Sequence, residues 1–348
     1  GGAVSDIKLK FEGLDRLFTK GSELFMQTSL GTVIDSKPIA IQNRDSIKLS
    51  YQLNKTTVRF EVGKYDIKED LIIDPTLVFS TYSGSLANNF GFTATYDEQG
   101  NLYAGGSVFD QGYPITLGAF DITFNSSSTL ECDLGSCWGI SDIGITKYSA
   151  DGKSRLYSTY LGGNRCEVPH SLIVNNRNEL FVLGTTSSDN YPVTNNAFDQ
   201  TFNGGNTANL ANGIYVNYTH GSDIVVSRLS SDGSAMLAST YVGGTQNDGL
   251  NLNGDLVANY ADQMRGEIIL DDFQNVVIGS STASEDFPVT SGALQTVYGG
   301  GEQDGIVFKM DENLSRMIWS SYFGGNDADG IYSIIQSNSN DVYAAGGT

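Results

Sequence analysis

Hydrophobic and polar residues alternate along much of the first 74 residues of the chain. The alternation is clearest at Ile7, Leu9 and Phe11, and it returns over residues 47–53 and 58–62, on either side of a polar turn. A period of two places one set of side chains on a buried face and the other in water, as in antiparallel sheets. Residues 1–74 are therefore predicted to form a β-rich N-terminal module.

A different pattern follows residue 75, where short apolar runs come in pairs separated by polar turns. In the first unit, residues 91–96 and 101–106 flank one turn, and residues 142–148 and 154–160 flank another. Such pairs predict β-hairpins, and we name the four strands of a unit A to D in chain order. The next two units follow the same plan, with strands at 171–174, 180–184, 224–229 and 236–241, and then at 267–270, 276–279, 306–310 and 317–322.

These units are copies of one repeat. A tyrosine in a Ser/Thr-rich string recurs at spacings of 78, 81 and 81 residues, and an aspartate at the start of strand C recurs at 81 and 81. Copies at a fixed period stack to bury their faces, and tandem four-stranded antiparallel units are typical of a β-propeller. The structural anchors of the repeat are Tyr82, Tyr160, Tyr241 and Tyr322, together with Asp142, Asp223 and Asp304.

The predicted fold is thus all-β, with the N-terminal antiparallel module at 1–74 and a propeller portion at 75–348. The segment around Tyr82 matches a strand D with no strand A, B or C before it, and the last residues supply only an A and a B. We expect this segment to close the ring from its other end, which requires chain beyond Thr348. The expected parts are a closing strand at 76–84, blades at about 88–163, 164–244 and 245–325, and a partial blade at 326–348.

Composition supports the all-β prediction and narrows the possible partners. The 41 glycines and the low content of charged residues, 17%, favour short strands and tight turns. A net charge of −20 repels nucleic acid and anionic membranes, so neither is an expected partner. No apolar run approaches the roughly 18 residues that a membrane-spanning helix needs.

The long loops of the predicted propeller all fall on one face. Antiparallel strands place the B-to-C and D-to-A connections at the same edge of each sheet, and the tight A-to-B and C-to-D turns at the other. The long connections are the ones at 113–141, 191–222, 245–265 and 287–303. Because long loops on a rigid scaffold commonly carry binding sites, this face is the expected place for a protein or glycan ligand; surface decoration is the alternative.

One of these loops carries oxygen-bearing side chains of the kind that bind Ca²⁺. The candidates are Asp248, Asn251, Asn253 and Asp255, although their spacing is not that of an EF-hand. The alternative is ordinary Asn/Asp turn chemistry in a loop. The chain is not expected to need any other cofactor.

The recurring aspartates at the start of strand C invite a catalytic interpretation, but repetition argues against it. A carboxylate present in every unit is expected to organise that unit, for example by accepting backbone N–H groups. We therefore predict no catalytic residues and no enzymatic activity.

Three cysteines lie on loops of the same predicted face. Cys132 and Cys137 bracket a short stretch of a B-to-C connection, and Cys166 lies in the next D-to-A connection. Any of the three disulfide pairings is sterically conceivable, and the local pair of Cys132 with Cys137 is the simplest.

Several of these strings resemble the SBBP-type β-propeller repeats of Bacteroidota surface and secreted proteins. The likeness lies in the Ser-Thr-Tyr-Leu-Gly-Gly string at 158–163, the Tyr-Pro-Val-Thr string at 191–194 and the hairpin at 222–234. Residues 6–13 and 71–77 are similar to the β-rich module that often precedes such repeats. The resemblance implies export to the cell surface or medium, in many members by type IX secretion, and a place among adhesins and gliding-associated proteins. It also implies that the N-terminal module is incomplete here.

The resulting functional hypothesis is a non-catalytic extracytoplasmic propeller that acts as an adhesin, scaffold or interaction segment of a larger bacterial protein. Two alternatives stay open. One is a calcium-dependent carbohydrate-binding module, and the other is a propeller glycoside hydrolase, which needs a suitably spaced pair of carboxylates.

Overall fold

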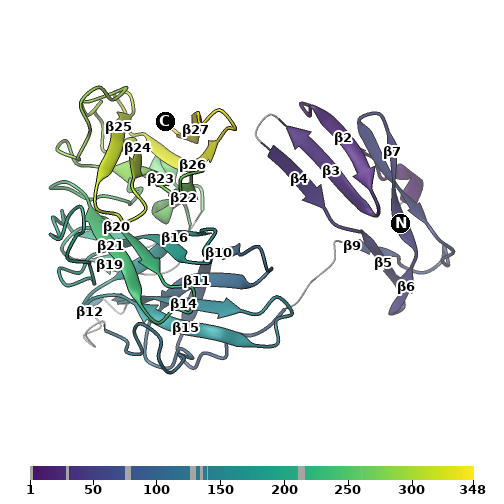
Figure 1. The fold of residues 1–348 in the computed structure, drawn as a ribbon, viewed down its shortest axis with the longest axis horizontal. Helices are drawn as coiled ribbons and strands as arrows, with labels where there is room; N and C mark the ends of the chain where they lie inside the picture. Colours follow the sequence, from purple (N-terminus) through teal and green to yellow (C-terminus); the bar gives the residue numbers. More distant parts are fainter. Residues whose placement is uncertain are drawn as a thin grey trace. The chain divides into compact units, whose positions relative to one another are not determined.

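The chain folds into two compact all-β units, seen in a computed structural model (Figure 1). The structure describes residues 3–28, 31–74, 80–125, 131–133, 136–138, 140–210, 216–259 and 261–348. The first unit comprises residues 1–80 together with the short segment Gln336–Asp341, and the second comprises Thr81–Ile335 and Val342–Thr348. Within the described ranges, no helix is long and apolar enough to span a membrane.

The N-terminal unit consists of small antiparallel sheets. The alternating residues of the sequence form β7 and β8, whose register pairs Leu49 with Val62 and Leu53 with Val58. Leu49 of β7 and Val58 of β8 are buried, and so is Leu24 of β3. The three sheets are β1 (Leu9–Lys10), β8 (Thr57–Val62) and β7 (Leu49–Asn54); β2 (Arg16–Lys20), β3 (Glu23–Thr28) and β4 (Gly31–Asp35); and β6 (Asp45–Ile47), β5 (Ile39–Gln42) and β9 (Ile72–Asp74).

The second unit contains three four-stranded antiparallel sheets, each with its strands in chain order (Figure 1). The four strands of each sheet match strands A to D of one sequence repeat. Sheet I is β10 (Asn89–Tyr96), β11 (Leu102–Val108), β14 (Asp142–Tyr148) and β15 (Arg155–Leu161); sheet II is β16 (Glu167–Val174), β17 (Leu180–Thr186), β20 (Asp223–Leu229) and β21 (Met236–Val242); sheet III is β22 (Glu267–Leu270), β23 (Val276–Thr282), β24 (Asp304–Met310) and β25 (Met317–Phe323).

Shorter elements occupy the connections and the C-terminal end. The B-to-C connections of sheets I and II each contain a two-stranded hairpin, and a further hairpin follows sheet III. These hairpins are β12 (Glu131–Asp133) with β13 (Ser136–Trp138), β18 (Ala208–Leu210) with β19 (Val216–Tyr218), and β26 (Gly330–Gln336) with β27 (Val342–Gly347). Three 3-10 helices complete the described elements: η1 (Val4–Asp6), η2 (Gly254–Leu256) and η3 (Asp262–Met264).

The core of the second unit lies between successive sheets. One apolar cluster joins Leu161 of sheet I to Leu180 and Val225 of sheet II. Another joins Val226 of sheet II to Phe308 of sheet III. Strands β17 and β20 are buried along their whole length, as expected for strands covered on both faces.

The strand expected at 76–84 is not formed at residues 80–84, and residues 75–79 lie outside the described ranges. Tyr82 is 97% exposed, whereas Tyr160, Tyr241 and Tyr322 are 2%, 1% and 1% exposed. An extended segment becomes a strand only beside a neighbour that pairs its backbone N–H and C=O groups. No described strand pairs with residues 80–84, so the closing strand stays a prediction that depends on a pairing partner.

Candidate ligand pocket on the loop face

The long connections of sheets I to III emerge at one edge of each sheet. Strands A to D alternate in direction, so the B-to-C and D-to-A connections leave from the same end. The opposite end carries tight turns such as the one at Gly152, whose φ of +68° favours glycine. The edge with the long connections is called the loop face below.

A pocket of about 290 Å³ lies on the loop face where sheets I and II meet. Every residue that lines it belongs to a B-to-C or a D-to-A connection. The first B-to-C connection gives Phe120, Asp121 and Asn125, the D-to-A connection gives Gly162 and Gly163, and the second B-to-C connection gives Asn190 and Pro192.

Hydrogen bonds fix the polar side chains of this pocket. The Asp121 carboxylate accepts from the backbone N–H of Thr123 at 2.9 Å and from the side-chain amide of Asn125. The Asn190 side-chain oxygen accepts from the backbone N–H of Asn164 at 2.8 Å. The pocket therefore presents carboxylate, amide and backbone groups beside one aromatic ring, a combination suited to a small polar ligand.

A buried pair of carboxyl groups lies directly behind the glycine floor of the pocket. A Cβ atom on Gly162 would come within 2.7 Å of both Asp142 and Glu167, so only glycine fits there. Asp142 accepts the backbone N–H of Asn125 at 2.7 Å, and Glu167 accepts that of Gly163 at 3.1 Å. Burial, together with repulsion from Asp142, raises the pKa of Glu167 to about 8.

The same carboxyl pair recurs in the next two repeats. Asp223 lies with Asp248 around Gly243, and Asp304 lies with Asp329 around Gly324. Burial raises the pKa of Asp223 to about 7, and burial with repulsion from Asp223 raises the pKa of Asp248 well above its usual range. The second member of each pair, Glu167, Asp248 and Asp329, follows the 81-residue period of the sequence.

This second member was missed in the sequence analysis, although the period could have revealed it. Its residue type changes from Glu to Asp, and Asp248 was grouped with its loop neighbours instead. Hydroxyl groups complete its hydrogen bonding: Ser188 and Thr186 donate to Glu167 at 2.5 and 2.6 Å, and Thr282 donates to Asp248. Asp142 and Glu167 have no solvent exposure. These two carboxyl groups can share a proton, and their hydrogen bonds fix the D-to-A connection to the sheet.

The tyrosines near the end of strand D form hydrogen bonds with the B-to-C connection of their own sheet. The Tyr322 hydroxyl donates to the backbone oxygen of Ser284 at 2.8 Å and accepts the backbone N–H of Phe287 at 3.0 Å. The Tyr241 hydroxyl donates to the backbone oxygen of Ser188 at 2.8 Å. These rings position the start of each B-to-C connection.

The four calcium candidates do not share one set of partners. Asp248 belongs to the carboxyl pair with Asp223, whereas the Asn251 amide donates to the Tyr332 hydroxyl at 3.0 Å. Asn253 caps η2 by accepting the backbone N–H of Asp255 at 2.9 Å. Among the described residues, no three His, Cys, Asp or Glu side chains converge as a metal site would require. Calcium binding at this loop stays a prediction.

The three cysteines lie on the connections where they were expected. Cys132 and Cys137 are direct partners in the register of the β12–β13 hairpin. Cys166 is fully buried, and this burial raises the pKa of its thiol to about 12. A disulfide between Cys132 and Cys137 stays a prediction.

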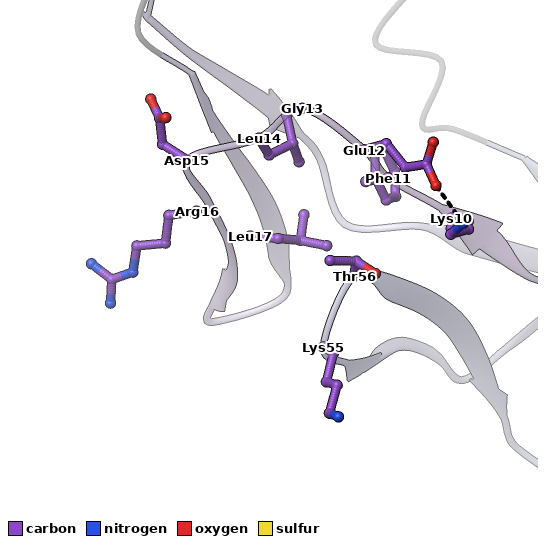
Figure 2. A pocket seen from close by; sticks show the side chains of 10 residues that line it. All are labelled: Lys10, Phe11, Glu12, Gly13, Leu14, Asp15, Arg16, Leu17, Lys55 and Thr56. Atoms are coloured by element: carbon purple, nitrogen blue, oxygen red, sulfur yellow. Dashed lines mark ion pairs between the residues drawn. The ribbon is translucent and has the colours of Figure 1, made fainter.

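A separate pocket of about 400 Å³ lies within the N-terminal unit (Figure 2). Leu14 and Leu17 line its apolar side, and the charged ends of Arg16 and Lys55 point away from them in Figure 2. The Arg16 guanidinium lies over the ring of Phe18, 4.5 Å from its centre. These cations are surface groups, so the pocket shows no built site for an anion.

The fold and the pocket define an all-β protein with a repeated sheet unit and a loop-lined pocket. In comparisons with known proteins, residues 1–76 match the family described as a domain of unknown function, DUF7948. A crystal structure of a protein of unknown function from Dyadobacter fermentans is similar with a TM-score of 0.40 and 8% identity, over 92% of this chain and 70% of that chain. The comparison with curated proteins gives no match.

Proposed function

We propose that the second unit is part of a β-propeller that serves as a non-catalytic interaction module outside the cytoplasm. The observation that carries the proposal is the composition of the loop-face pocket, which is lined entirely by B-to-C and D-to-A connections. These connections differ in length and sequence between repeats, while the sheets beneath them are alike. A rigid repeated scaffold with unequal loops is a common arrangement for ligand recognition.

The buried carboxyl pairs support a non-catalytic role. A general acid or a nucleophile has to reach its substrate, and Asp142 and Glu167 have no exposed surface. A pair repeated at Asp223 and Asp248 is better explained as a structural device than as a catalytic dyad. The burial and repetition of these carboxyl groups therefore favour a binding module over a glycoside hydrolase.

Location outside the cytoplasm rests on the resemblance of the repeats to SBBP-type surface propellers. The excess of acidic over basic residues, 40 against 20, is in keeping with a soluble exported protein. In this proposal the chain is an adhesin, scaffold or interaction segment of a larger surface or secreted protein, with export by type IX secretion.

A carbohydrate is the ligand class that the pocket favours. Phe120 supplies an aromatic ring, and Asp121 and Asn190 supply hydrogen-bonding groups of the types that recognise sugar hydroxyls. If calcium takes part, binding on a glycan array depends on Ca²⁺ and disappears with EDTA.

Binding to a glycan array with matched variants tests the proposal. Asp121→Ala removes a pocket carboxylate, whereas Asp199→Ala removes its counterpart in the next repeat, which accepts the same kind of backbone bond, from Thr201 at 2.8 Å. We expect the first substitution to weaken binding at least tenfold and the second to leave it unchanged. Equal losses would assign both residues to folding, and release of a sugar product would contradict the non-catalytic role.

A further inference from the structure

In the second unit, each sheet buries one face of the sheet before it. Strand D shows this clearly, because Leu161 in sheet I and Val242 in sheet II are both 0% exposed. The equivalent residue of sheet III, Phe323, is 47% exposed. The hairpin β26–β27 packs against sheet III through Val342 and Ala344 but leaves this part of the face open.

A backbone hydrogen bond marks the contact between successive sheets. The N–H of Phe120 donates to the oxygen of Gly233, in the C-to-D turn of sheet II, at 2.8 Å. The N–H of Phe198 donates in the same way to the oxygen of Leu314, in the C-to-D turn of sheet III, at 2.9 Å. The third residue of this series is Leu294, whose side chain is 85% exposed.

A cation on strand C makes a second contact to the same turn. The Lys147 ammonium donates to the backbone oxygen of Ser231 at 3.5 Å, and the Arg228 guanidinium donates to that of Glu312 at 2.9 Å. Each donor lies on one sheet and each acceptor lies 84 residues further along the chain. The third member of this series is Lys309, on β24.

The open part of sheet III forms an apolar groove of about 540 Å³ in the second unit. Strand B of every complete sheet pairs with strand A on one edge and strand C on the other, whereas β27 has β26 as its only described partner. The groove therefore runs beside an open strand edge. Its apolar lining residues are Leu294, Val307, Trp319, Phe323, Val342 and Tyr343.

We propose that β27 and this groove form the docking surface for one further antiparallel strand pair with the sequence pattern of β20–β21. The incoming strand C would extend the sheet beyond β27, and its partner strand would cover Phe323. Its C-to-D turn would supply a carbonyl group to the N–H of Leu294 and a second one to Lys309. The Lys309 ammonium already pairs with Asp271 at 2.6 Å, as that of Lys147 pairs with Asp97 at 3.2 Å while it also contacts Ser231. This inference is independent of the ligand pocket on the loop face.

A second copy of this chain is not the occupant. Each described C–D pair is already held by its own strand B, in the pairs β11–β14, β17–β20 and β23–β24. A second copy could offer such a pair only by opening one of its own sheets. The occupant is therefore a repeat-type strand pair from outside residues 1–348.

The test adds such a strand pair to the full chain. Thr348 lies 162 residues, or two periods, after Thr186, so a copy of residues 187–244 appended to Thr348 continues the repeat in register. The appended segment contains no tryptophan, and a W138F background leaves Trp319 as the reporter in the groove. The matched control carries V226P in the appended copy, which removes a ladder hydrogen bond from its strand C.

Docking predicts slower amide hydrogen exchange over Val342–Gly347 and a blue shift of Trp319 emission in the extended chain, with both effects lost in the control. Equal exchange and emission in the extended and control chains would overturn the proposal. Dimerisation of the unextended chain that Phe323→Asp abolishes would also overturn it, because the face would then bind a second copy.

Discussion

The tyrosine that ends strand D of sheet III provides a sharp test of how the loop face is held. Tyr322→Phe removes a hydroxyl that bonds both Ser284 O and Phe287 N–H, at 2.8 and 3.0 Å. The ring is 1% exposed, so water cannot replace the lost partners without a rearrangement. Two lost hydrogen bonds, each with a partner left unsatisfied, predict a loss of about 2–4 kcal/mol in the free energy of unfolding.

Tyr157→Phe is the matched control. Tyr157 is also a strand D tyrosine, 2% exposed, but its hydroxyl has no hydrogen-bond partner in the described part of the chain. Its removal should leave the free energy of unfolding unchanged or raise it slightly. Urea unfolding followed by circular dichroism gives the global effect, and hydrogen exchange over residues 283–287 gives the local one. Equal destabilisation by both substitutions would refute the role assigned to the Tyr322 hydroxyl.

Two further predictions concern the carboxyl pairs. In the folded state the pKa of Asp223 is about 7 and that of Glu167 is about 8, against 3.8 and 4.5 in the unfolded chain. Because the folded state therefore binds more protons between these values, the free energy of unfolding should fall as the pH rises from about 4 to 8. Urea unfolding midpoints measured from pH 4 to 9 check this pH dependence. Glu167→Gln should make the decrease smaller, and an increase in stability with pH would contradict the prediction. Gly243→Ala should cost about 1–3 kcal/mol, because the added methyl group would lie 2.7 Å from Asp248. Gly254→Ala, with no neighbour within 4 Å, should be close to neutral in the same unfolding assay.

The sequence predicted the strands of the repeat well because their signals are local and recur. Turn residues and apolar runs near Gly152 and Gly233 mark each hairpin, and the structure has strands at every predicted A to D position of the three repeats. The segment at Tyr82 is not a strand over residues 80–84, and its role in closing the ring stays a prediction. Its string is the same, but a strand depends on a neighbour that the local sequence does not specify.

The candidate site was only partly predictable. The face that carries long loops followed from strand direction alone, and the pocket lies there. The local sequence does not predict the pairing of Asp142 with Glu167, because these residues are 25 positions apart. They meet only in the folded chain, on either side of Gly162 in the D-to-A connection. The same folding brings Asp248, one of the predicted calcium ligands, beside Asp223 in a second carboxyl pair.

Hydrogen exchange with a bound glycan tests the central claim most directly. The probe is the glycan that gives the strongest array signal, added to the full chain. The account predicts slower exchange at residues 121–125, 162–165 and 189–192 on the loop face, no change at the C-to-D turns around Gly152 and Leu314, and recovery of the glycan intact. Protection at those turns instead of the loop face, or cleavage of the glycan, would contradict it.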